Sequence, residues 1–148
     1  MDLSSIVKQA AKLIDASVEE EAHAFFVTVP VSQGEDEDED DRTQLVMVEL
    51  DEEGEIVAVS TDVGPSSEDH DLVEVLRLMR DAVFSRVYLS EATEDEPEQL
   101  VVEASLVAER LEPELLSTVL QEVAEVADEI EIMLFDDDVD DEDDPLIE

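Results

Sequence analysis

Two runs of acidic residues are the densest groups of side chains in this sequence that could bind a metal ion. They are GEDEDEDD, at 34–41, and DDDVDDEDDPLIE, at 136–148. A calcium loop of the EF-hand type needs oxygen ligands at its first, third and fifth positions, glycine at the sixth and glutamate at the twelfth. In the second run Asp141 stands in place of the glycine and Ile147 in place of the glutamate, and GEDEDEDD contains no internal glycine. The pattern indicates solvated charge and no dedicated metal site.

The whole chain is strongly acidic, since 46 acidic residues face 7 basic ones and the formal net charge is −39. Direct binding to nucleic acid or to an anionic membrane surface needs clustered Lys and Arg, so this charge excludes both. One alternative is an acidic mimic of nucleic acid that sequesters a basic protein. The acids, however, occur on every expected helix as well as in the two runs, which is what adaptation to molar salt predicts. We therefore expect a halophilic source.

Residues for catalysis are scarce. The chain has no cysteine, only two histidines (His23 and His70), and three isolated glycines, so thiolate chemistry, a structural zinc site and a phosphate-binding glycine loop are not expected. His70 lies in EDHD, where the neighbouring acids stabilise it as a solvated residue. The sequence predicts no enzyme, no cofactor and no metal. The N-terminus lacks the basic start and apolar run of a signal peptide, and no segment is long enough to span a bilayer, so we expect a cytoplasmic protein.

The hydrophobic pattern predicts an α+β fold with the element order α-β-β-β-α-β-β-α. Helical spacing of apolar residues marks three helices, and alternating or β-branched runs mark five strands. The expected helices cover 3–18, 72–83 and 113–134, and the expected strands cover 22–33, 45–50, 56–63, 86–92 and 100–108. Short connections imply an antiparallel sheet that helices cover on at least one face. We expect one domain at 1–135, an acidic loop at 34–42 between two paired strands, and an acidic, disordered tail at 136–148.

The first strand offers the one candidate contact surface. Phe25 and Phe26 are adjacent, so their side chains point to opposite faces of the sheet. Pro30 cannot donate a ladder hydrogen bond and therefore favours an edge or a strand end. The candidate protein-binding residues are Phe25, Phe26, Val27 and Val29.

The C-terminal half of the chain contains two segments, DLVEVLRLMRDAVFSRVYL and LVVEASLVAERLEPELLSTVLQEVAEVADEI, which together cover roughly 71–134. In these segments the chain resembles the YbjN-like family, which shares the fold of type III secretion chaperones. The first half matches in element order alone. The resemblance implies a small bacterial cytoplasmic protein that forms a homodimer and binds another polypeptide, as a non-enzymatic chaperone-like module. The acidic runs have no counterpart in the family pattern.

Overall fold

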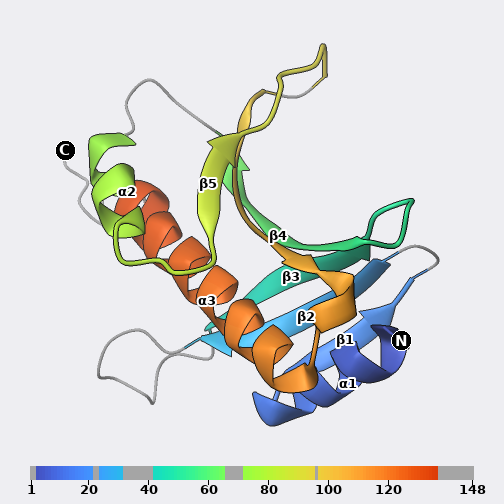
Figure 1. Ribbon diagram of the computed structural model, residues 1–148. Helices are drawn as coiled ribbons and strands as arrows, with labels where there is room; N and C mark the ends of the chain where they lie inside the picture. The colour runs from blue at the N-terminus through green and yellow to red at the C-terminus, as the bar shows by residue number, and fades with distance from the viewer. Residues whose placement is uncertain (1–2, 22–23, 32–41, 66–71, 96, 137–148) are drawn as a thin grey trace, which may run out of the picture.

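The computed structural model describes residues 3–21, 24–31, 42–65, 72–95 and 97–136 (Figure 1). The acidic loop at 34–41, the tail at 137–148, His23 and His70 lie outside these residues.

Six strands form one antiparallel sheet in the order β1-β2-β3-β4-β6-β5. Their bounds are β1 Ser17–Glu20, β2 Ala24–Val31, β3 Arg42–Leu50, β4 Ile56–Pro65, β5 Arg86–Leu89 and β6 Gln99–Val107. The helices are α1 Leu3–Leu13, α2 Leu72–Met79 and α3 Pro113–Glu131, and a 3-10 turn, η1 Ala108–Arg110, precedes α3 while a π-helical turn, η2 Ile132–Asp136, follows it. The predicted α+β fold with an antiparallel sheet is confirmed, with one strand, β1, added between the first helix and the first expected strand.

The added strand exists because α1 ends earlier than the periodicity of 3–18 predicts. Asp15 adopts a left-handed conformation with φ of 57°. The amide of Ala16 donates to the carbonyl of Ala11 at 2.8 Å, and the amide of Asp15 donates to the carbonyl of Lys12 at 3.4 Å. These two bonds form a Schellman motif, which closes a helix at its C-terminus. The left-handed position of this motif is usually occupied by glycine, which makes the motif recognisable in a sequence. Here Asp15 occupies it. The helix therefore ends before Val18, and Val18 belongs to strand β1.

Helix α3 covers one face of the sheet and forms the hydrophobic core together with the strands. Figure 1 shows it running across the strands, with α1 beside its N-terminal part and α2 beside its C-terminal part. Its fully buried apolar residues recur every three or four positions: Leu116, Val119, Leu120, Val123, Ala124, Ala127 and Ile130. The face of the sheet that packs against α3 contributes buried β-branched residues, among them Val27, Val46, Val48, Val57, Val59 and Val102. Because every second strand residue points to the same face, these valines form one apolar layer beneath α3.

The short loop DEEG, at 51–54, lies between the apolar runs 45–50 and 56–63, and its glycine predicts a hairpin; β3 and β4 form that hairpin. Gly54 takes φ of 74°, and its amide donates to the carbonyl of Asp51 at 3.0 Å. The carboxylate of Asp51 accepts the amides of Glu55 at 2.9 Å and Ile56 at 3.2 Å, and these bonds lower its pKa. An acidic residue therefore has a structural role in this turn, as Asp side chains commonly do.

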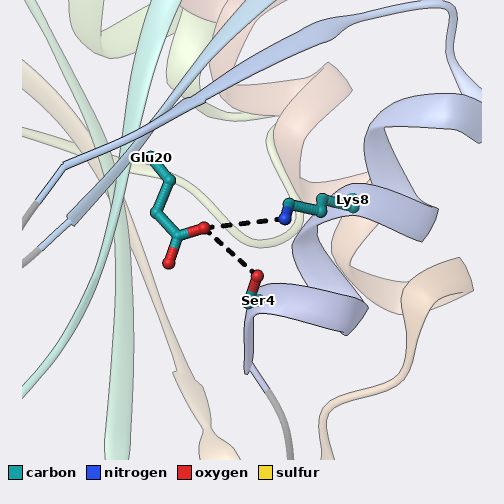
Figure 2. A network of polar contacts seen from close by, with 3 residues as sticks. All are labelled: Ser4, Lys8 and Glu20. Atoms are coloured by element: carbon teal, nitrogen blue, oxygen red, sulfur yellow. Dashed lines mark hydrogen bonds and ion pairs between the residues drawn. The ribbon is translucent and has the colours of Figure 1, made fainter.

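Pro30 lies beyond the pairing of β2 with β1, as far as the described residues show it. Strand β1 pairs with β2 only from Phe25 to Thr28, and Pro30 pairs with Thr43 of β3 on the other side. The expected position near a strand end is thus confirmed. Strand β1 itself is held to α1 by exposed contacts: Figure 2 shows Glu20 facing Lys8 at 3.6 Å and the Ser4 hydroxyl at 3.4 Å.

None of the described helices is both long and apolar enough to cross a membrane.

Candidate protein-binding surfaces

The face of the sheet opposite the helices carries apolar side chains that no described element covers. We call it the open face and define it by Phe26, Leu45, Met47, Ile56 and Val107. Leu45 is 56% exposed and Val107 is 53% exposed. Met47 pairs with Phe26 on one side and Ser60 on the other, while Ile56 pairs with Val107 at the far end of the sheet. Neighbouring strands therefore place apolar groups next to one another on this face.

The four candidate residues of β2 divide between the two faces. Phe25, Val27 and Val29 are buried in the core beneath the helices. Phe26 is the one that points to the open face, where it is half-buried and lines a cavity. Successive side chains of a strand point to opposite faces, so Phe25 and Phe26 lie on different sides of the sheet. The sequence alone could not tell which of the two phenylalanines the helices would cover.

The cavity lies where β3 and β4 part. Their ladder runs from Leu50 and Val57 to Met47 and Ser60, and beyond it the hydroxyl of Thr61 donates to the carbonyl of Leu45 at 2.7 Å. Strand β4 then has a bulge between Asp62 and Gly64 in its pairing with β6, and a bulge bends and twists its strand. Figure 1 shows β4 curving away from β3 toward β5 and β6. The cavity has a volume of about 410 Å³ and is lined by Phe26, Gln44, Leu45, Met47, Ser60, Thr61, Asp62 and Glu131.

Gln44 ties the parting strand to the end of α3. It is a buried polar residue in a face that is otherwise mostly valine. Its Nε2 donates to Asp128 Oδ1 at 3.2 Å and to Glu131 Oε1 at 2.9 Å. Asp128 is fully buried, and Glu131 lies three residues later at the cavity. The amide therefore fixes the Glu131 carboxylate relative to β3, since a hydrogen bond to a charged group is stronger than one between neutral groups.

A second apolar surface follows the segment from α2 to β5. We call it the α2–β5 surface and define it by six of its exposed large hydrophobic residues: Leu72, Val73, Leu76, Val83, Phe84 and Leu89. Leu76 is 66% exposed and Val83 is 77% exposed. Residues 72–90 contain Arg77, Arg80 and Arg86 but only the two acids Glu74 and Asp81, so their net charge is +1 in a chain of −39. The sequence patterns did not predict this surface. The positive net charge of residues 72–90 within an acidic chain is the signal that could have indicated it.

Glu122 of α3 fixes the loop that carries this surface. Its carboxylate accepts the amides of Val83 at 3.0 Å, Phe84 at 2.8 Å and Ser85 at 2.8 Å, and the Ser85 hydroxyl at 2.6 Å. Burial alone would raise the pKa of Glu122, but these hydrogen bonds outweigh it, and the pKa is lowered. The exposed side chains of Val83 and Phe84 are thus presented on a loop anchored to the core helix.

Within the described residues no group of three or more His, Asp or Glu side chains is arranged to hold a metal ion.

Comparison with known proteins rests on structure, because neither a protein-family model nor a curated protein sequence matches the chain. The type III secretion chaperone SycH of Yersinia pestis, crystallised in complex with a stable fragment of YscM2, superposes with a TM-score of 0.52. The match has 14% identity and covers 89% of this chain and 99% of SycH. This chain has the secretion-chaperone fold. YbjN of Escherichia coli, described as a putative transcription regulator, superposes with a TM-score of 0.56 at 13% identity over 95% of this chain and 93% of YbjN.

The resemblance to these two groups is therefore confirmed at the level of the fold. The secretion-chaperone fold spans the first half of the chain as well, where the sequence matched in element order alone. Neither neighbour is described as an enzyme, and the SycH neighbour holds another polypeptide.

We expect Glu122→Gln to lower the free energy of unfolding by roughly 1 kcal/mol, because the variant weakens hydrogen bonds to a charged acceptor. The pKa of Glu122 is lower when folded, so its stabilisation is complete above about pH 4.3, the unfolded value, and is lost as the pH falls through the folded pKa. The stability gap between wild type and variant should therefore close in acid. Chemical denaturation at a series of pH values measures this gap.

Glu129→Gln is the matched control, because it removes the same charge from an exposed site on α3. Amide hydrogen exchange at Val83–Ser85 should accelerate in the Glu122 variant and stay unchanged in the control. Equal effects of the two variants would contradict the anchoring role.

Proposed function

We propose that this chain is a non-enzymatic, chaperone-like protein of a halophile's cytoplasm that binds another polypeptide. The observation that carries the proposal is the open face. Apolar groups such as Leu45 and Val107 remain exposed on this face, while the other face packs against the helices, although the chain is rich in charged residues that could occupy exposed positions. Contiguous exposed apolar groups commonly mark interaction sites. The complex of SycH with a YscM2 fragment supports a polypeptide as the partner.

The partner segment lies across the open face, where Phe26, Leu45 and Met47 offer contacts at the spacing of neighbouring strands. Phe25, Val27 and Val29 act behind it, since their packing beneath the helices sets the position of β2. An extended segment suits such a surface, because alternate side chains of a strand reach alternate pockets.

Affinity capture tests this binding. Wild type, Leu45→Glu and a deletion of 34–41 together with 136–148 serve as baits in a lysate of the source organism, at 0.2 M and 2 M potassium chloride. We expect wild type and the deletion variant to retain the same partner in 2 M salt, because apolar recognition survives screening, and Leu45→Glu to lose it. Alanine at Phe26 should weaken the same capture.

The acidic mimic is the second candidate, and the net charge of −39 is the observation that favours it. It predicts the opposite pattern in this experiment: basic proteins held at 0.2 M salt, lost at 2 M, and lost from the deletion variant. That outcome would overturn the chaperone-like proposal.

We further propose that the chain forms a homodimer through the α2–β5 surface. Two chains of −39 repel one another strongly, and the segment 72–90, with its net charge of +1, is where they can approach. Strand β5 is also an outer strand of the sheet, and it is only four residues long. Its exposed Leu89 and the apolar residues of α2 give a second copy a surface to bury.

Sedimentation velocity checks the dimer. We expect wild type to sediment as a dimer in 2 M potassium chloride and Leu76→Glu to sediment as a monomer, because burying a new carboxylate is costly. Leu45→Glu introduces the same charge at a comparably exposed leucine of the open face and should remain dimeric. A monomeric wild type, or dissociation by Leu45→Glu instead, would contradict this assignment.

Adaptation to salt is the third part of the proposal. The pKa of Glu125 is raised by burial and then by the charges of Glu129 and Glu122, so like charges already disfavour one another on α3. Screening shortens from about 10 Å at 0.1 M salt to about 3 Å at 1 M. The thermal unfolding midpoint should therefore rise by several degrees between 0.1 M and 2 M potassium chloride, as followed by circular dichroism. A midpoint that does not change with salt would remove the support for a halophilic source.

A further inference from the structure

The two outer strands of the described sheet, β1 and β5, carry different side chains. Strand β1 ends in two glutamates, and Glu21 follows them directly. Strand β5 reads Arg-Val-Tyr-Leu and contains no acidic residue. Charged side chains on an outer strand hinder its pairing with another chain. The one charge of β5 is paired within the sheet, because Nη2 of Arg86 lies 2.6 Å from Oε1 of Glu103 on β6. Two copies of this acidic chain therefore meet less repulsion at β5 than at β1.

Strand β5 is fixed at both of its ends. Just before it, the carboxylate of Glu122 accepts the backbone amides of residues 83–85. Just after it, the amide of Ser90 donates to the carbonyl of Gln99 at 2.9 Å, and the amide of Gln99 donates to the hydroxyl of Ser90 at 3.0 Å. A strand held in place in the single chain costs less ordering when another strand is added to it.

The bond from Ser90 also shows which backbone groups of β5 point away from β6. In an antiparallel pair, residues alternate between bonding to the neighbouring strand and pointing away from it. Ser90 bonds to β6, so Tyr88 and Arg86, two and four residues earlier, bond to β6 as well. The amides and carbonyls of Val87 and Leu89 therefore point to the outer edge, where they are oriented to bond with a further strand.

The side chains of β5 divide between the two faces of the sheet. Val87 and Leu89 pair with core residues of β6, so they lie on the side of the helices. Arg86 and Tyr88 lie on the side of the open face, where the Arg86 guanidinium is 5.5 Å from the centroid of the Tyr88 ring. Tyr88 is 39% exposed and Leu89 is 40% exposed. A strand added at this edge thus finds apolar or aromatic surface on both faces.

We propose that β5 pairs antiparallel with β5 of a second copy, across a two-fold axis at Tyr88 that is perpendicular to the sheet. The inference rests on the proposed homodimer and names the contact that forms it. In this pairing Val87 of each copy opposes Leu89 of the other, so each outward amide meets an outward carbonyl. The two sheets become one, and both open faces lie on the same side of it.

Symmetry and side-chain direction favour this register over its neighbours. Opposed residues of an antiparallel pair share a face, so the axis must pass at a residue and not between two residues. An axis at Arg86 would oppose two like charges, and an axis at Leu89 would pair only the end of the strand. An axis at Val87 would place the Leu89 carbonyl opposite the Ser85 amide, which is already bonded to α3. The axis at Tyr88 opposes two aromatic rings on one face and apolar pairs on the other, which are favourable cross-strand pairs.

Disulfide trapping tests this pairing, because the chain has no cysteine of its own. The two Tyr88 residues would form a non-hydrogen-bonded pair with Cα atoms about 4.5 Å apart. Disulfides bridge Cα atoms roughly 4.4–6.8 Å apart, so Tyr88→Cys should form a covalent dimer in 2 M potassium chloride and a glutathione redox buffer. The two Arg86 positions would lie roughly 13 Å apart along the strands, so Arg86→Cys alone should not cross-link. A mixture of Arg86→Cys and Ser90→Cys should cross-link, because these two positions oppose each other.

A proline variant tests the backbone contact without a cross-link. Proline is tolerated on an outer strand where the missing amide would point away from the sheet. Leu89→Pro removes an outward amide and keeps the bonds to β6, so it should sediment as a monomer with an unchanged circular dichroism spectrum. Leu89→Ala is the matched control, since it shortens the same side chain but keeps the amide, and it should remain dimeric.

The outcomes separate this pairing from the proposed homodimer. A dimeric wild type whose Tyr88→Cys variant does not cross-link, or a dimeric Leu89→Pro, would overturn the strand pairing and leave a dimer held by other contacts of the α2–β5 surface. Equal cross-linking of Tyr88→Cys and Arg86→Cys would indicate random collision and would also overturn it. A monomeric wild type would reject the homodimer and the pairing together.

Discussion

The packing of α3 against one face of the sheet determines the rest of this structure. A single helix of 19 residues contacts β2, β3, β4 and β6, and its buried stripe meets the valine rows of these strands. Burying such side chains contributes about 1.5–3 kcal/mol each, which makes this layer the main favourable term in folding. Since the described helices pack on that face, several apolar side chains of the other face stay exposed, among them Leu45 and Val107.

The same helix also positions the two surfaces for which we propose partners. Near its middle, Glu122 holds the loop of Val83 and Phe84, and toward its end Asp128 and Glu131 hold Gln44 of β3. These carboxylates, like that of Asp51 in the β3–β4 turn, accept hydrogen bonds from donors whose positions the fold fixes. Structural acids and solvating acids thus occur on one helix, and their roles differ because their neighbours differ.

The exposed apolar side chains and the acidic side chains of this chain are distributed unevenly over its surface. Two exposed apolar surfaces persist on a chain of −39, and one of them coincides with a segment of net charge +1. The strong repulsion elsewhere limits which faces of two chains can meet, so apolar contact and low local charge select the same segment. The open face has no comparable segment of low charge, and our proposal of a partner there rests on its exposed apolar side chains.

Much of the fold followed from local sequence patterns, because periodicity depends on neighbours along the chain. The spacing of Leu116 to Ile130 predicted α3, and Gly54 predicted the β3–β4 hairpin. The end of α1 did not follow, since Asp15 adopts a conformation that glycine usually supplies. The sequence also placed Phe25 and Phe26 on opposite faces, but only the packing of α3 decided which face was left open. The cavity required the tertiary structure altogether, because it arises where two strands part and where residues 44, 62 and 131 come together from distant points of the chain.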